Sequence, residues 1–161
     1  MRPDTIRLIL KEITESHISG VRFFHGMPKD DNTAHSLSFP AHILAPITTS
    51  VPIDTTGIYR AFNVSGVIVD QLKTSRSADD MDRALDKMFG VTEEIINKFI
   101  VDYGMDGTVF AGEAIEFNVT TSPTYVPVLD SGDTNLTGYA YTLTIRPPAP
   151  FDCTNLSSAF N

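Results

Sequence analysis

One long amphipathic helix, set between two regions patterned for strands, most constrains what this chain can fold into. Residues 75–104 read SRSADDMDRALDKMFGVTEEIINKFIVDYG, and apolar side chains recur there at helical spacing. Ser77 and Asp80 are spaced as in a capping box, with Asp in place of Glu or Gln, and Gly104 is a good terminator. The face predicted to be buried comprises Met81, Leu85, Met88, Thr92, Ile95, Phe99 and Tyr103. Such a Met and aromatic stripe is typical of a core-facing helix.

A second, shorter helix is predicted at the N-terminus. Asp4 can cap it, and Gly20 ends it. Its apolar stripe is formed by Ile6, Ile9, Leu10, Ile13 and His17.

The remaining segments alternate like strands and are separated by Gly, Pro and Asn turns. Residues 58–72 predict a long strand whose second half is buried on both faces, and residues 139–146 predict a late strand ended by Pro147. Residues 107–121 read as one strand and residues 124–130 as a short one broken by Pro127. Pro40 lies inside the predicted strand 36–46, so that strand is expected at a sheet edge or at a bulge.

These elements predict an α+β fold with a mostly antiparallel sheet, packed by the N-terminal helix and the long central helix. Residues 1–150 are expected to form a single domain, as 161 residues suit one core. Residues 151–161 form a polar C-terminal tail, expected to be exposed or to dock on a neighbouring subunit.

Composition excludes several classes of protein. The formal net charge of −8, with 12 scattered basic residues, disfavours a protein that grips phosphate backbones. The single cysteine, Cys153, permits neither an intrachain disulfide nor a CxxC metal site. The amphipathic start does not resemble a signal peptide, and no apolar run reaches membrane-spanning length, so a soluble protein of a reducing compartment is expected.

Three of the four histidines raise the question of a metal or catalytic centre. His25, His35 and His42 flank a polar loop containing Asp30 and Asp31. Their spacings of ten and seven residues do not match the HxH or HxxxH pairs that place two rings on one ion. A site assembled by folding stays open, as a small metal-dependent enzyme that also uses Cys153, but structural roles are favoured. No catalytic, cofactor-binding or metal residue is assigned, and no cofactor is expected.

Two further groups of residues suggest alternative binding functions. The tyrosines Tyr125, Tyr139 and Tyr141 could line the binding face of a carbohydrate- or protein-binding module. The acidic side of the central helix is expected to be a solvated face with i,i+4 pairs such as Asp79 with Arg83 and Glu94 with Lys98. Alternatively, that face meets a basic partner or lines a passage for something anionic.

The order of elements, with "VRFFHG", "SFPAHILAP", the acidic helix and the closing "GYAYTLTIRPPAPFDC", resembles small virion proteins of tailed bacteriophages. The families are those of the tail terminator, tail-completion and neck (head–tail connector) proteins. The resemblance implies a non-enzymatic subunit of a ring, commonly sixfold, located in the tail or neck of a virion and made in the host bacterial cytoplasm. It implies contacts with itself and with tail-tube, connector or portal-associated proteins, and DNA only as a passing contact.

An acidic lumen would agree with that implication, because a repeated −8 subunit repels phosphates and lets DNA slide. The strands containing Pro40 and Pro127, and the C-terminal tail, are expected to supply subunit contacts, because open strand edges invite docking.

Overall fold

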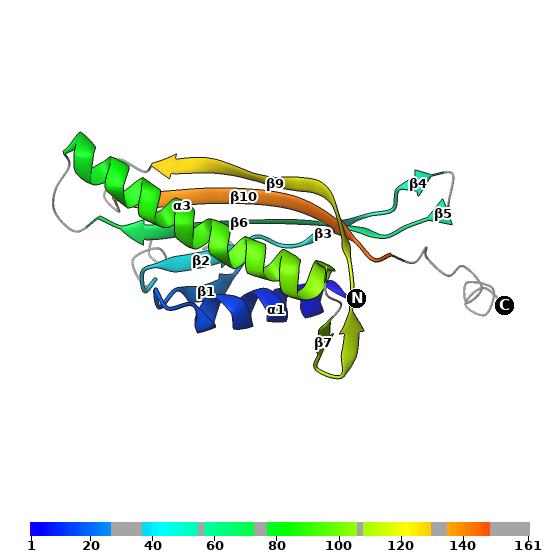
Figure 1. Ribbon diagram of the computed structural model, residues 1–161. Helices are drawn as coiled ribbons and strands as arrows, with labels where there is room; N and C mark the ends of the chain where they lie inside the picture. Colours follow the sequence, from blue (N-terminus) through cyan, green and yellow to red (C-terminus); the bar gives the residue numbers. More distant parts are fainter. Residues whose placement is uncertain (27–36, 55–56, 73–76, 106–107, 130–134, 149–161) are drawn as a thin grey trace.

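The computed structural model describes residues 1–26, 37–54, 57–72, 77–105, 108–129 and 135–148. Among the described residues, helices α1 and α3 pack on the same face of one large sheet, whereas two small hairpins extend from the body (Figure 1). All strand pairs of the large sheet are antiparallel except one. The predicted α+β class, with its N-terminal helix and its long helix, is confirmed.

Helix α1 spans Pro3–Ser16 and buries its predicted apolar stripe. Asp4 is not the N-cap as predicted: Arg2 occupies that position without a side-chain capping bond, and Pro3 begins the helix because the first turn needs no N–H from it. Asp4 instead lies in the first turn, 3.4 Å from Nε of Arg7. Of the predicted stripe, the buried residues are Ile6, Ile9, Leu10 and Ile13.

Helix α3 spans Ala78–Ile100 and continues into the π-helical turn η1, Val101–Met105. The predicted cap is confirmed, since the Ser77 hydroxyl accepts a hydrogen bond from the Asp80 backbone N–H at 3.2 Å. The predicted face is buried from the middle of the helix onward, whereas Met81 and Leu85 are half-buried. Its buried residues are Met88, Val91, Thr92, Ile95, Ile96 and Phe99.

The large sheet has the strand order β1-β2-β6-β10-β9, and β3 also pairs with β6. The pair β1–β2 is the parallel one. A bulge interrupts the β9–β10 ladder near Thr142 and Thr144. The strands are β1 (Arg22–His25), β2 (Ala41–Leu44), β3 (Thr48–Ser50), β6 (Ala61–Gln71), β9 (Asn118–Leu129) and β10 (Leu136–Arg146).

The two hairpins are β4 (Ile53–Asp54) with β5 (Gly57–Ile58), and β7 (Thr108–Phe110) with β8 (Glu113–Ile115). The prediction of one continuous strand over residues 107–121 is therefore wrong. Ala111 and Gly112 have φ of 50° and 83°, so the chain reverses there in a two-residue turn. Figure 1 shows both hairpins projecting beyond the helices.

Two proline predictions are also wrong, for related reasons. Pro40 does not lie inside a strand; β2 begins directly after it and is an inner strand between β1 and β6. Because proline has no N–H to give to a ladder, Pro40 stands at the start of this inner strand and not within it. Pro127 does not break its strand, since β9 runs unbroken for 12 residues at the sheet edge, where one row of donors has no partner strand.

The core lies between the sheet and the two helices. Alternate residues of β6 and β10, among them Phe62, Ile68, Leu143 and Ile145, face the helices and are buried, as the parity of the sequence predicts. On the opposite face, Val69 is buried as predicted, but Val67 is only half-buried. Within the described residues, no helix packs on that opposite face (Figure 1).

Candidate functional site

A buried polar chain of three side chains crosses the core and ties α1, β2 and β10 together. Nδ1 of His42 lies 2.7 Å from the Thr14 hydroxyl, and its Nε2 lies 2.8 Å from the Tyr141 hydroxyl. All three side chains are at most 1% exposed. Gly66 faces this group from β6, where an added Cβ would lie 2.9 Å from the Tyr141 hydroxyl.

This network holds a neutral imidazole. Burial lowers the pKa of His42 to about 3, and burial also raises the pKa of Tyr141, so neither group is charged near neutrality. A neutral ring donates through one nitrogen and accepts through the other, which satisfies both neighbours in either tautomer. The network therefore satisfies the hydrogen-bonding groups of three buried side chains, and the basic nitrogens of His42 are not exposed to solvent.

The histidine cluster is not assembled as a site in the described residues. His42 has both nitrogens engaged within the core, whereas His25 is exposed at the end of β1. His35 lies outside the described residues, as do Asp30, Asp31 and Cys153. The described part of the chain contains no group of three His, Cys, Asp or Glu side chains that could hold a metal ion.

The prediction that three tyrosines line one binding face is wrong. Tyr141 is buried at 1% exposure, and Tyr125 and Tyr139 are half-buried on the helix-packed side of the sheet. The ring of Phe89 on α3 covers both, with centroids 5.6 Å from Tyr125 and 5.2 Å from Tyr139. Strand parity places all three on the same face, but that face belongs to the core.

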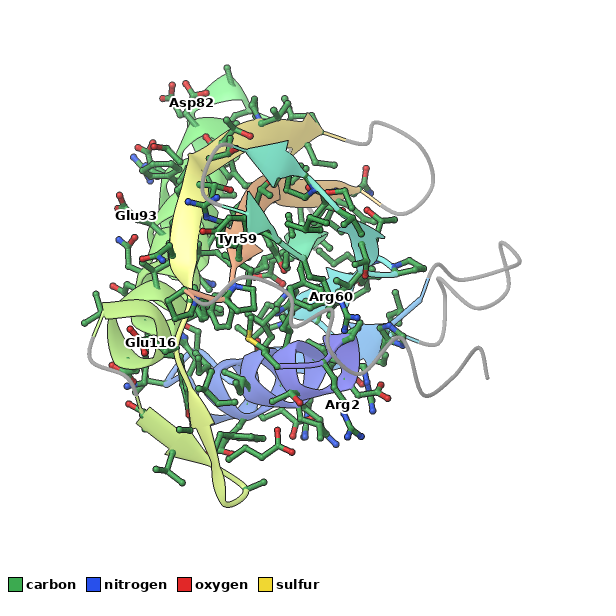
Figure 2. The ribbon with its side chains drawn as sticks, turned by 90° about the vertical axis from the view of Figure 1, so that its right-hand side faces the viewer. Arg2, Tyr59, Arg60, Asp82, Glu93 and Glu116 are labelled. Atoms are coloured by element: carbon green, nitrogen blue, oxygen red, sulfur yellow. The ribbon has the colours of Figure 1, made fainter. Side chains whose placement is uncertain are left out.

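Acidic side chains form a stripe along the exposed side of α3. Asp79, Asp82, Asp86 and Glu93 recur at spacings of three, four and seven residues, and all are exposed. Figure 2 shows Asp82 and Glu93 on the outer side of α3, with Arg2 and Arg60 elsewhere on the molecule. Burial, and then the charge of Glu93 in this stripe, raise the pKa of Tyr125 on β9.

The predicted pairing of Glu94 with Lys98 is wrong. Lys98 Nζ binds Asp102 at 2.7 Å, which raises the pKa of Lys98, and Glu94 binds the His17 ring at 2.9 Å. Asp102 lies at i,i+4 from Lys98 in the π-helical continuation of the same segment, whereas His17 comes from the turn after α1.

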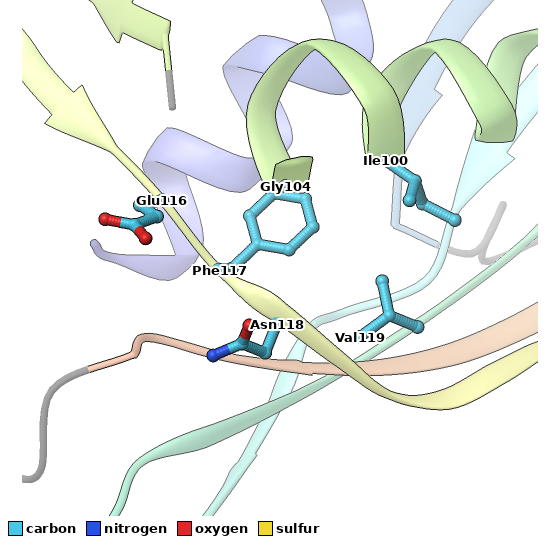
Figure 3. A pocket seen from close by; sticks show the side chains of 6 residues that line it. All are labelled: Ile100, Gly104, Glu116, Phe117, Asn118 and Val119. Carbon is cyan, nitrogen blue, oxygen red and sulfur yellow. The ribbon is translucent and has the colours of Figure 1, made fainter. Parts of the chain in front are cut away.

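A groove of about 420 Å³ opens where the end of α3 meets the start of β9. Figure 3 shows Ile100 and Val119 pointing toward each other across it, with the Phe117 ring against Gly104. An added Cβ at Gly104 would lie 2.8 Å from that ring, so the close approach requires glycine. The groove thus has an apolar floor, and its polar lining residues are Glu116 and Asn118.

Sequence reasoning missed the buried network and this groove. Thr14 belongs to the buried stripe of α1, four residues after Leu10, and that spacing was a usable signal for a polar group in the core. No comparable signal exists for the groove. Its two sides are the end of α3 and the start of β9, and the hairpin of β7 and β8 between them was predicted as part of one continuous strand.

Comparisons with known proteins identify no family. No protein-family model matches the sequence, and no curated protein matches it. Among solved structures, the chain is similar to one from the "Virion of native gene transfer agent (GTA) particle", at 8% identity and a TM-score of 0.48. The likeness covers 87% of this chain and 92% of that chain. At that score and identity it establishes neither kinship nor function.

Across the described residues, no helix combines the length and apolarity that crossing a bilayer demands.

Proposed function

We propose that this protein is a structural subunit of a phage-type virion that assembles into a ring at the tail end or at the head–tail neck. The work of the molecule is to present surfaces to its own copies and to neighbouring virion proteins, without catalysis. The resemblance in element order noted for the sequence supports the class. Rings of the class that the sequence resembles are commonly sixfold.

The observation that carries the proposal is the sheet face on which no described helix packs. This face carries a band of apolar side chains that runs across the strands. Most of them are half-buried, and Val126, on the edge strand β9, is 59% exposed. A row of uncharged hydrogen bonds flanks the band, with Thr124 and Thr142 joined at 2.6 Å and Thr144 donating to Asn63 at 3.0 Å. Contiguous apolar surface with a polar border is typical of protein–protein contact sites. The other half-buried members of the band are Phe24, Ile43, Val67, Val128 and Ala140.

The charge distribution supports a passage for DNA. The helix-free face is nearly without carboxylates, whereas the stripe on α3 concentrates them on one side. Copies with a net charge of −8 associate most favourably through their uncharged surfaces. In the proposed ring the stripe of each copy faces the lumen, where its repulsion of phosphates keeps DNA from being held.

The oligomeric state of the purified protein tests the proposal. Native mass measurement and light scattering, from micromolar to millimolar protein, are expected to show one closed oligomer, visible as annuli by electron microscopy. A monomer at every concentration would refute the ring.

The lumen is tested by a charge-reversed variant, Asp82→Lys with Glu93→Lys. We expect this variant to keep the oligomer mass and to retain short duplex DNA at low salt, whereas the unchanged protein does not. The matched control reverses carboxylates on α1, Glu12→Lys with Glu15→Lys, where no gain in DNA retention is expected. Tight DNA binding by the unchanged protein would contradict the acidic passage.

A further inference from the structure

A smaller cavity, of about 170 Å³, lies between the first half of α3 and the sheet. Its volume is about that of five or six water molecules at ~30 Å³ each. Ala84, Lys87 and Met88 form the helix wall, because spacings of three and four residues place them on one face of α3. The lining residues on the other side are Asp70, Gln71, Leu72 and Thr137.

Thr137 lines this cavity and carries a hydroxyl that no residue in the described part of the chain satisfies. The residue is 0% exposed. A buried hydroxyl without a partner costs stability, and valine, which has the same shape, would avoid that cost. The hydroxyl is closed to solvent, but turning it toward the cavity breaks no hydrogen bond, because it makes none. A polar ligand in the cavity would supply the missing partner.

The carboxylate of Asp70 stands beside that hydroxyl. Asp70 and Thr137 lie opposite each other in the β6–β10 ladder, so their side chains share a face, with Cβ atoms about 5 Å apart. The Gln71 backbone N–H donates to one carboxylate oxygen at 2.8 Å, and Lys87 Nζ lies 3.3 Å from the other. The Asp70 side chain is 27% exposed and that of Lys87 60%. The carboxylate is thus fixed on its strand, whereas the ammonium is loosely held.

These charges favour a cation as the ligand. An anion would meet the Asp70 carboxylate in a chain of net charge −8, and a neutral molecule would not use that charge. Lys87 already shows that an ammonium group can approach this carboxylate. A ligand ammonium with three N–H donors can serve Asp70 and Thr137 together. A short alkyl chain suits the wall formed by Ala84 and Met88.

We propose that this cavity binds a small primary alkylammonium ion, which donates to the Asp70 carboxylate and the Thr137 hydroxyl. Its alkyl chain packs against Ala84 and Met88, and it displaces Lys87 from the carboxylate. Lys87 is therefore an internal competitor for the site. The cavity lies on the helix-packed side of the sheet, so this inference goes beyond the ring and does not depend on it.

Titration with n-butylammonium chloride, followed by NMR of labelled methyl groups, tests the site. The methyl groups of Ala84, Met88 and Thr137 report on the cavity itself, and we expect their signals to shift and saturate. Tetramethylammonium chloride at the same ionic strength has no N–H donor and is expected to leave these signals in place. Equal shifts with both salts, or none with n-butylammonium, would overturn the proposal.

Variants of the two charged residues separate this site from a general attraction of cations to an acidic protein. Asp70→Asn is expected to weaken n-butylammonium binding by about 10-fold or more. Lys87→Met keeps the length of the side chain and removes the competing charge, so binding should tighten by about 2- to 5-fold. Asp82→Asn, at an exposed carboxylate of the stripe, is the matched control with unchanged affinity. Equal losses in Asp70→Asn and Asp82→Asn would refute the site.

The hydroxyl is tested separately. Thr137→Val is expected to weaken binding by about 5-fold and to leave the fold at least as stable to urea, because the hydroxyl has no bond to lose. Thr137→Ser keeps the hydroxyl and should keep most of the affinity. Unchanged affinity in Thr137→Val would overturn the part assigned to this hydroxyl.

Discussion

The buried imidazole of His42 predicts that acid destabilises this fold through a single side chain. The ring has a pKa of about 3 in the folded chain, whereas an unfolded histidine titrates near 6.5. Between these values the unfolded state binds the proton and the folded state does not, so each proton taken up favours unfolding. The contribution of His42 to the free energy of unfolding is constant above pH 6.5. Below that pH it falls by about 1.4 kcal/mol per pH unit. At pH 4 the loss relative to pH 7 is about 3 kcal/mol, a large part of the ~5–15 kcal/mol that stabilises a domain.

Urea unfolding at pH values from 7 to 4 measures this effect, with His42→Gln as the comparison. Carboxylates also titrate in this range, but they act in both proteins, and only the unchanged one loses the histidine contribution. The variant is expected to be less stable at pH 7, because an amide does not fill the ring's site between Thr14 and Tyr141. The difference in free energy of unfolding between the unchanged protein and His42→Gln, the stability gap, should narrow by about 3 kcal/mol between pH 7 and pH 4. His25→Gln, at an exposed position, is the control whose curve should stay parallel to that of the unchanged protein. A constant gap for His42→Gln would refute the buried neutral ring.

Three further substitutions test the packing. Tyr141→Phe removes the hydroxyl that bonds His42 and should cost about 1–3 kcal/mol in the free energy of unfolding, measured by urea titration at pH 7. Gly138→Ala should unfold the chain or lower its melting temperature by many degrees, because the added Cβ would lie 2.0 Å from the Ile68 carbonyl oxygen. Gly90→Ala on α3 should instead stabilise by up to about 1 kcal/mol in the same assay, since no described atom beyond its chain neighbours and the adjacent helix backbone lies within 4 Å of the new methyl group.

Periodicity predicted the parts of the fold that depend on one repeating pattern. The stripe of α1, the central part of the buried face of α3 and the parity of β6 and β10 all follow from spacing along a single element. Failures occurred where a few residues set the local conformation. The turn at Ala111 and Gly112 lacks the Asn-Gly or Asp-Gly signal, so β7 and β8 read as one strand. Pro40 was read as an interruption, although it marks where β2 begins.

The candidate site was less predictable because it depends on contacts distant in sequence. Thr14 and His42 are 28 residues apart, and His42 and Tyr141 are 99 apart, so no local pattern relates them. The histidine spacing disfavoured a paired metal motif, but it could not show that His42 has both nitrogens engaged. The tyrosine parity was correct, yet parity alone does not distinguish the face covered by helices from the open one.

Proline in β9 bears on how copies can join. Pro127 lies opposite Tyr139, and without an N–H it cannot belong to a hydrogen-bonded pair, so its backbone faces the open edge of the sheet. A strand added along that edge would find no donor there. Strand addition is therefore disfavoured at the place where an unpaired 12-residue edge would otherwise invite open-ended growth. Pairing of strands along the β9 edge is thus a less favourable subunit contact than contact through side chains. In the proposed ring, contact through the apolar side chains of the helix-free face keeps the edge unpaired and allows assembly to stop when the ring closes.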